Sequence, residues 1–189
     1  MLRPQFPLAT ERLLLRPFED GDLEWVQALE SRPEVVRYLY ELPLALDAAR
    51  DVLARRNGMR AIDDGSDALR LVGVLKETGE RVGDFGIWRA GREHQQGEIG
   101  YIVHPDHQGK GYATEGCELL LRLGFEDAGF HRIFARLDAR NSASARVLER
   151  LGMRREAHLR ENELVKGEWT DELIYGLLAT EWAARQNGA

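Results

Sequence analysis

The feature of this sequence that most constrains its fold is a loop with two glycines, Gly109 and Gly111, between a strand pattern and a helix pattern. Residues 98–103 have the composition of a strand, and residues 114–127 place apolar side chains at helical spacing. A second strand pattern follows at residues 133–137. Strand, helix and strand in this order predict a βαβ-like unit whose two strands are parallel.

The chain before this unit has the pattern of an antiparallel meander. Residues 69–75 alternate as a strand does, residues 77–80 supply a hairpin turn, and residues 82–88 return. With the strand at 98–103, they predict a mixed sheet with helices on its faces. The other predicted elements are a first strand at residues 10–18, helices at residues 20–31 (capped by Asp20 or Asp22), 47–58 and 142–151, a strand at residues 171–178 and a terminal helix at residues 181–186.

The composition argues against several classes of protein. The 26 Lys and Arg residues against 32 Asp and Glu residues give a net charge of −6, whereas a nucleic-acid partner usually requires a basic face. No apolar run approaches the ~20 residues of a membrane span. The single cysteine, Cys117, excludes an intrachain disulfide, and His104 and His107 lack a convincing third metal ligand. We therefore expect a cytoplasmic, single-domain protein over residues 1–189, with no metal, nucleic-acid or membrane partner.

The glycine loop predicts a phosphate site. The N–H groups of Gly109, Gly111 and Ala113 would lie at the start of a helix, where donors are unpaired and the helix dipole is positive. A Walker A loop would need four residues between its glycines and a lysine before Ser or Thr, and this loop has neither. A dinucleotide-binding G-x-G-x-x-G loop would have a third glycine where Thr114 stands, and a regular parallel sheet.

The segment Gln108-Gly109-Lys110-Gly111-Tyr112-Ala113 resembles the Q/R-x-x-G-x-G/A motif of the GNAT N-acetyltransferases. The longer run G-K-G-Y-A-T-E is similar to the RimJ/RimL-type branch, which acetylates N-termini of ribosomal proteins. The resemblance continues, in the expected order, through residues 10–16, 97–103, 141–153 and 171–178. It implies a GNAT fold of the α/β (α+β) class. Such a fold has a mixed, mostly antiparallel twisted sheet of about seven strands, helices on both faces and a central strand pair that splays apart.

The resemblance also implies acetyl-coenzyme A as the co-substrate and a primary amine as the acceptor. The N–H near Val103 would polarise the thioester carbonyl, and Asn141 would bond the pantetheine arm. The residues implied to bind the co-substrate are Val103, Gln108, Gly109, Lys110, Gly111, Tyr112, Ala113, Thr114 and Asn141.

Two side chains are candidates for removing the proton of the amine or for hydrogen-bonding the leaving sulfur. Glu98 is the candidate base, acting through water, and its alternative is an ordinary solvent-facing strand residue. Many members of the family place a tyrosine seven residues after the asparagine at this helix start, but here that position is Leu148. We therefore assign to Ser144 a hydrogen bond to the departing sulfur, and its alternative is a serine that caps its own helix. Cys117 is read as a core residue rather than an acyl-carrying thiol.

The acceptor side is less constrained. Trp25, Trp88, Tyr38 and Tyr40 either line it or belong to the core. The expected acceptor is a protein or peptide N-terminal amine, or a small-molecule amine. Alternatives are a polyamine or aminoglycoside-type acetyltransferase, and a non-catalytic acyl-coenzyme A sensor. An exposed strand or helix face is also compatible with a homodimer.

Overall fold

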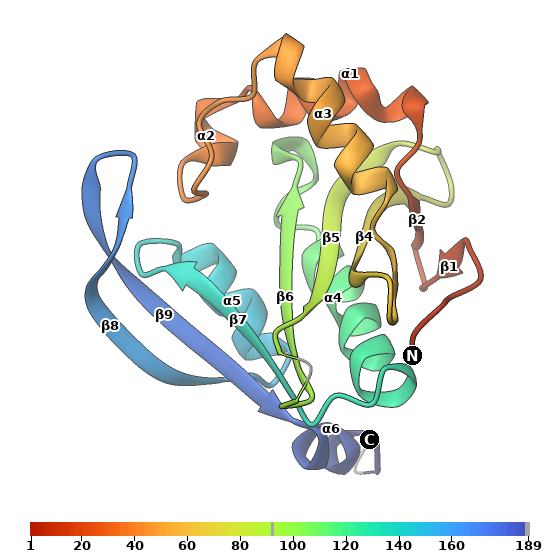
Figure 1. Cartoon of the computed structure of the whole chain (residues 1–189), viewed down its shortest axis with the longest axis vertical. Helices are drawn as coiled ribbons and strands as arrows, with labels where there is room; N and C mark the ends of the chain where they lie inside the picture. The colour runs from red at the N-terminus through yellow and green to blue at the C-terminus, as the bar shows by residue number, and fades with distance from the viewer. Residues whose placement is uncertain (92, 188–189) are drawn as a thin grey trace.

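The computed structural model describes residues 1–91 and 93–187, in which an open twisted sheet is covered by helices on both faces (Figure 1). Its strands follow the order β1-β2-β4-β5-β6-β7-β9-β8, and β3 pairs with β4. The strands are β1 Leu8–Ala9, β2 Leu13–Pro17, β3 Arg60–Ile62, β4 Asp67–Leu75, β5 Arg81–Arg89, β6 Gln96–Val103, β7 Arg132–Asp138, β8 Arg154–Val165 and β9 Glu168–Leu178. The helices are α1 Leu23–Glu30, α2 Pro33–Val36, α3 Leu46–Asn57, α4 Tyr112–Arg122, α5 Ser142–Arg150 and α6 Ala179–Asn187.

Two apolar clusters lie on the two faces of the sheet. The larger cluster packs α4 against the strands through residues such as Phe85, Leu120 and Ile133, all fully buried. The smaller cluster lies under α1 and α3 and contains Phe18 and Val72. Burial of these side chains is the main stabilising contribution, and it fixes the helices on opposite faces.

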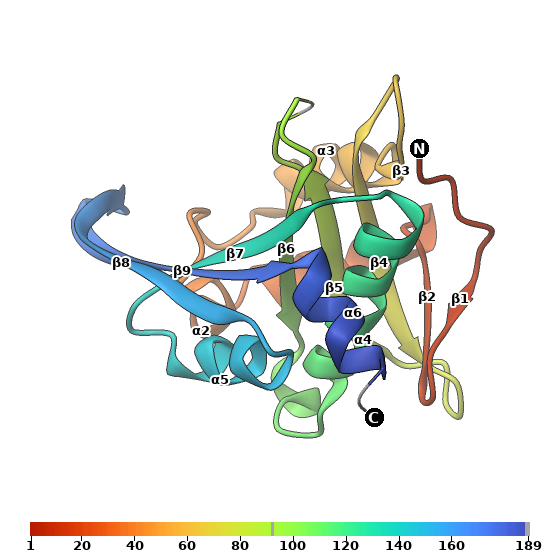
Figure 2. The same cartoon turned by 90° about the horizontal axis from the view of Figure 1, so that it is seen from below.

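The parallel pair β6 and β7 splays as expected. Within the described residues, the two strands pair only where Gln96, Gly97 and Glu98 face Arg132, Ile133 and Phe134. Beyond Glu98 the strand β7 turns away, while β6 stays paired with β5 as far as Val103 (Figures 1 and 2). The fold class is therefore confirmed, with nine strands in the described residues where about seven were expected.

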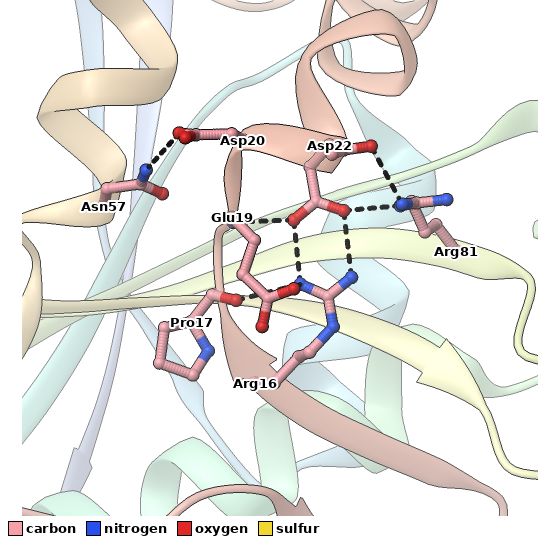
Figure 3. Close-up of polar contacts among 8 residues, drawn as sticks. Arg16, Pro17, Glu19, Asp20, Asp22, Asn57 and Arg81 are labelled. Atoms are coloured by element: carbon pink, nitrogen blue, oxygen red, sulfur yellow. Dashed lines mark hydrogen bonds and ion pairs between the residues drawn. The ribbon is translucent and has the colours of Figure 1, made fainter.

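The first helical segment differs from the expectation that Asp20 or Asp22 caps a helix over residues 20–31. Residues 20–22 form a 3₁₀ turn before α1, and no side-chain cap from Asp22 closes the helix. The carboxylate of Asp22 is instead buried between Arg16, at 2.8 Å, and Arg81, at 2.5 Å (Figure 3). The same carboxylate also accepts from the Glu19 N–H at 2.9 Å, so it caps the 3₁₀ turn and binds two arginines from different strands, rather than capping α1.

The strand β8 was not predicted. Its 12 residues are mostly exposed and contain many charged side chains, so the apolar alternation that identifies a half-buried strand is missing. One long helix was predicted at residues 114–127. The structure has the α-helix α4 as far as Arg122, followed directly by a π-helical segment, Leu123–Asp127. Among the described residues, no helix combines the length and the apolar character that crossing a membrane requires.

Candidate active site

Two cavities meet where β6 and β7 separate. The first has a volume of about 290 Å³ and lies against β5, β6, β7 and the segment after α2. The second, of about 440 Å³, lies between the start of α4 and α5. The residues that line both cavities are Tyr38, Leu39, Tyr101, Ile102, Asn141 and Ser144. A group bound in one cavity can therefore reach a group bound in the other at this junction.

The glycine loop takes a backbone conformation that requires its glycines. Gly109 has φ +73° and Gly111 has φ +86°, both in the left-handed region that other residues disfavour. Gly111 is the N-cap of α4, and the helical hydrogen bonds begin where Glu115 N donates to Gly111 O. The N–H groups from Gly111 to Thr114 are thus without helical partners, at the positive end of the helix. Their residues line the second cavity, as a phosphate site requires.

The side chains of two predicted binding residues also brace the site. The Gln108 side chain donates from Nε2 to Val103 O at 3.1 Å, which folds the loop back onto β6. Asn141 accepts at Oδ1 from the N–H of Ser144 at 3.1 Å and so caps α5. Its amide NH₂ group is not used by that cap. Lys110, in contrast, is exposed and does not line either cavity.

The N–H of Val103 points into the gap. His104 N donates to Val82 O, so Val103 and the opposite residue, Gly83, form a pair without direct hydrogen bonds. The N–H of Val103 is therefore directed away from β5, toward the side that β7 has left. The N–H of Tyr101, two residues earlier, has the same direction. These two donors can hydrogen-bond an extended ligand that lies between the strands.

A cluster of contacts that the sequence did not reveal joins the N-terminal segment to the loop. The carboxylate of Glu115, on α4, accepts from Thr10 Oγ1 at 2.5 Å and from Arg12 Nε at 2.7 Å. Arg12 also donates to Lys110 O at 2.9 Å and lies over the Tyr112 ring. Burial alone would raise the pKa of Glu115, but the hydrogen bonds from Thr10 and Arg12 outweigh burial and lower it. This cluster holds the glycine loop in place.

Two arginines on α5 were also missed. Arg146 and Arg150 line the second cavity, four residues apart and so on one helical face. Their spacing was visible in the sequence, but which face of the helix looks into the cavity was not. Guanidinium groups there suit a phosphate-bearing ligand.

The first cavity contains Glu98 in an ion pair. Its Oε1 accepts from Arg136 Nε at 3.0 Å, and this hydrogen bond is the largest cause of the raised pKa of Arg136. The indole of Trp88 forms a wall here, because a Cβ at Gly86 would collide with the ring and a Cβ at Gly100 would crowd it.

The aromatic residues named from the sequence divide between the cavity and the core. Tyr38, Tyr40 and Trp88 all line the first cavity. Trp25 packs against the smaller apolar cluster instead. Three of the four aromatic residues therefore line this cavity, and the fourth belongs to the core.

The floor of the first cavity is a buried chain of charges. Arg56 donates to Glu30 at 2.5 Å and lies 3.4 Å from Asp84, which also pairs with Arg70 at 2.8 Å. Burial is the largest influence on the Glu30 carboxyl, and it raises the pKa of that group. The four residues come from α1, α3, β4 and β5, so only the folded chain brings them together.

The junction itself carries two hydroxyl groups. Ser144 lies half-buried in the first turn of α5, and the Tyr101 hydroxyl lies 3.5 Å from the Ser144 carbonyl oxygen. Burial raises the pKa of Tyr101, so its phenol stays neutral. Cys117 is fully buried, and burial also raises the pKa of its thiol, which fits a core residue. No group of metal-ligating side chains occurs among residues 1–91 and 93–187.

Comparison with known proteins assigns this architecture. Residues 12–154 match the model of the acetyltransferase (GNAT) domain. The uncharacterized N-acetyltransferase YnaD of Bacillus subtilis is 31% identical over 175 residues, which are 93% of this chain and 98% of that protein. A GNAT-family acetyltransferase structure from Bacillus anthracis superposes with a TM-score of 0.82 at 31% identity, covering 92% of this chain and 99% of that chain.

The fold is shared more widely. The spermidine N-acetyltransferase of Vibrio cholerae, solved with CoA and spermine, has a TM-score of 0.77 at 22% identity, covering 91% of this chain and 98% of that chain. The family match spans most of the sequence, and the glycine loop, the splayed strands and the two cavities all fall within it. The chain belongs to the GNAT family of N-acetyltransferases.

Proposed function

We propose that this protein transfers the acetyl group of acetyl-CoA directly to a primary amine, with both substrates bound at once. The observation that carries the proposal is the meeting of the two cavities at Tyr101, Asn141 and Ser144, beside the gap between β6 and β7. The second cavity offers unpaired N–H groups and two arginines for the phosphates of the co-substrate, and the first leaves room for an acceptor.

Each step of the proposed reaction is assigned to a residue of this chain. The N–H of Val103 hydrogen-bonds the carbonyl oxygen of the thioester, and such a donor contributes ~3 kcal/mol to the transition state. Glu98 takes a proton from the attacking amine, through water. Ser144 hydrogen-bonds the sulfur as the carbon–sulfur bond breaks and the carbon–nitrogen bond forms. The proton that the amine loses balances the one that the sulfur gains, and Asn141 holds the pantetheine arm.

The proposed acceptor is the α-amine of a protein or peptide, or a small-molecule amine. An α-amine has a pKa near ~8, so about a tenth of it is neutral at pH 7, whereas a lysine side chain at ~10.4 is almost fully charged. An α-amine therefore asks little of a general base. Glu98 can supply that base even though its carboxylate is paired with an arginine. Similarity of the loop to the RimJ/RimL-type branch supports the same acceptor.

A polyamine or aminoglycoside acceptor is the main alternative. It is supported by the spermidine N-acetyltransferase that shares the fold. A polycation requires an acidic pocket, yet the charges that line the first cavity nearly balance. They are Glu30, Glu41, Asp84 and Glu98 against Arg56, Arg70 and Arg136. A non-catalytic sensor is the second alternative, because Leu148 stands where many family members have tyrosine.

The release of free thiol from acetyl-CoA tests the proposal. The protein is offered a panel of amino acids, short peptides with a free N-terminus, simple amines, spermidine and an aminoglycoside. We expect turnover with one or more of the first three classes. Fastest turnover with spermidine would favour the polyamine alternative, and CoA binding by calorimetry without turnover would favour the sensor. Folded protein that does not bind CoA would overturn the proposal. The cytoplasmic location and the homodimer stay predictions.

A further inference from the structure

Arg70 lies on the floor of the first cavity and uses only part of its guanidinium group within the protein. Its Nε donates to Asp84 Oδ1 at 2.9 Å, and its Nη2 lies 2.8 Å from Asp84 Oδ2. This pair occupies one edge of the planar group, and in the described part of the chain Nη1 has no hydrogen bond. The side chain is 21% exposed, so the cavity reaches it.

Arg56 lies near the same Asp84 carboxylate, and two of its nitrogen atoms have no hydrogen-bond acceptor within the described structure. The residue is only 4% exposed, and its Nε and Nη1 atoms are buried without a hydrogen-bond partner among the described residues. Buried donors without partners are costly. A ligand with oxygen acceptors would reduce the shortage of acceptors on this floor, whereas a ligand with only N–H donors would increase it.

The two arginines of the floor are the source of its unused donors. Arg56 and Arg70 are matched in charge by Glu30 and Asp84, and their ion pairs use only some of the N–H groups of the two guanidinium groups. The remaining donors favour a carboxylate or carbonyl oxygen there over an ammonium group, which has no acceptor to offer.

The floor lies beside the place where the acetyl group would be transferred. Ile102 lines both cavities, and it stands opposite Asp84 across the β5–β6 pair. Arg70 lies on β4, two strands from β6, but its side chain reaches Asp84 on β5, so its guanidinium group lies beside the strand next to β6. Glu98 lies four residues further along β6, or ~13 Å away. A group that Arg70 holds must therefore be only a few bonds from the reacting amine.

We propose that Arg70 binds an oxygen of the acceptor, on the carbon next to the one that bears the amine. The acceptor is then an α-amino acid or the first residue of a peptide, since the carboxylate of one and the carbonyl of the other supply that oxygen. This assignment rests on the proposed acetyl transfer. Simple amines and polyamines lack the oxygen and are poor acceptors. The walls formed by Tyr38, Tyr40 and Trp88 favour an aromatic or apolar side chain beside it.

A matched series of acceptors tests the proposal on the unmodified protein. Phenylalanine, phenylalaninamide, the dipeptide phenylalanyl-alanine and 2-phenylethylamine share one ring and differ in the oxygen. Spermidine is the fifth acceptor. Each kcat/KM is divided by the neutral fraction of the amine at the assay pH, because the amines differ in pKa. We expect phenylalanine or the two carbonyl compounds to exceed 2-phenylethylamine and spermidine by about ten- to a hundredfold, as one charge-assisted hydrogen bond provides.

Two variants then assign the preference to Arg70. Arg70→Gln removes both the positive charge and the planar set of guanidinium donors. Arg70→Lys keeps the charge but cannot bind Asp84 and the acceptor oxygen with two edges of one planar group. We expect the ratio of phenylalaninamide to 2-phenylethylamine to fall toward one in Arg70→Gln and to fall in part in Arg70→Lys. Arg89→Gln is the control, because Arg89 also pairs with an aspartate, Asp67, but lies outside both cavities. Thermal unfolding and CoA affinity verify that each variant is folded.

The outcomes separate this inference from the function on which it rests. Turnover of 2-phenylethylamine or spermidine equal to that of the oxygen-bearing acceptors overturns the inference and leaves acetyl transfer intact. An unchanged ratio in folded Arg70→Gln also overturns it. No turnover of any amine overturns both. If Arg70→Gln does not fold, the series on the unmodified protein and Arg70→Lys decide.

Discussion

Asp22 is a fully buried carboxylate that joins strand β2 to strand β5 through Arg16 and Arg81. Burial alone would raise the pKa of Asp22, but hydrogen bonds from the two arginines and from the Glu19 N–H outweigh burial and lower it. We expect Asp22→Asn to reduce the free energy of unfolding by about 3 kcal/mol at pH 7, because two guanidinium groups lose their partner. Chemical denaturation followed by circular dichroism measures the loss.

The pH dependence of that loss follows from the direction of the shift. A lowered pKa stabilises the fold above the unfolded value near 3.8, and the stabilisation disappears as the pH falls through the lower folded value. The difference between the unmodified protein and Asp22→Asn should therefore be constant above about pH 5 and shrink below pH ~4. A difference that stays the same down to pH 3 would contradict the assignment.

Glu98 provides the second prediction at this scale. If its carboxylate takes the proton of the amine, Glu98→Gln lowers kcat by about a hundredfold and removes the acid limb of the pH–rate profile. Steady-state kinetics from pH 5 to 9 measure both effects. Glu163→Gln is the control, since it removes the same charge from β8, outside both cavities. A profile in Glu98→Gln that matches the unmodified protein would show Glu98 to be only a partner of Arg136.

Single residues of the site were predictable where their chemistry depends on near neighbours. Asn141 and Ser144 were named because the family resemblance marks positions in one short segment, and both line the junction. The helix cap that joins them is also local in the sequence. Arg12 and Arg70 were missed because their partners Glu115 and Asp84 lie 103 and 14 residues away. No local pattern marks an arginine whose partner comes from another strand or helix.

At the scale of elements, α4 depends on two glycines for different reasons. Gly111 needs its positive φ to start the helix, whereas a Cβ at Gly116 would overlap the Phe85 ring in the core. We expect Gly111→Ala to weaken CoA binding about tenfold, since the left-handed conformation costs ~1–2 kcal/mol and the N–H groups turn away. We expect Gly116→Ala to lower the free energy of unfolding by ~1–3 kcal/mol through overpacking.

Calorimetry with CoA and chemical denaturation, both done on both variants, separate the two roles. Each variant is the control for the other, because both add one methyl group to the same segment of chain. CoA affinity per folded molecule should stay unchanged in Gly116→Ala. Equal losses of affinity in the two variants would show that the loop conformation is not what holds the phosphates.

Helices and strands with a clear pattern of apolar residues were predicted well, and those without such a pattern were not. The strand β5 lies in the middle of the sheet, and its residues between Arg81 and Arg89 are glycine or apolar except Asp84. Its predicted range, 82–88, therefore differs from the observed one by one residue at each end. The edge strand β8 is exposed on both faces along most of its length, so burial did not select an apolar alternation. Its position next to β9 came only from the folded hairpin.

At the scale of the whole molecule, the site depends on how far two strands separate. The splay between β6 and β7 was implied by the family resemblance rather than by any period in the sequence, since both strands read as ordinary strands. The first cavity collects side chains from α1, α3 and six other parts of the chain. Its balanced charge was therefore not predictable, because it is a property of tertiary contacts alone.

The tip of the hairpin formed by β8 and β9 lies near α2 (Figure 1). Lys166, at its tip, donates from Nζ to Val36 O at 2.6 Å. This contact steadies the segment that leads to Tyr38, a wall of both cavities. We expect Lys166→Met to raise KM for the acceptor about threefold to tenfold, because an exposed charge-assisted hydrogen bond contributes ~1 kcal/mol, with a smaller change in kcat.

Lys76→Met is the matched control for this prediction. Lys76 also donates from Nζ to a backbone carbonyl, that of Thr10, but neither residue lines the first cavity. The two substitutions remove the same charge and the same kind of bond, so a general effect of charge would appear in both. An acceptor KM that rises equally in both variants, or in neither, would mean that the hairpin does not help to shape the acceptor cavity. A rise confined to Lys166→Met would make acceptor binding dependent on a contact between parts of the chain 130 residues apart.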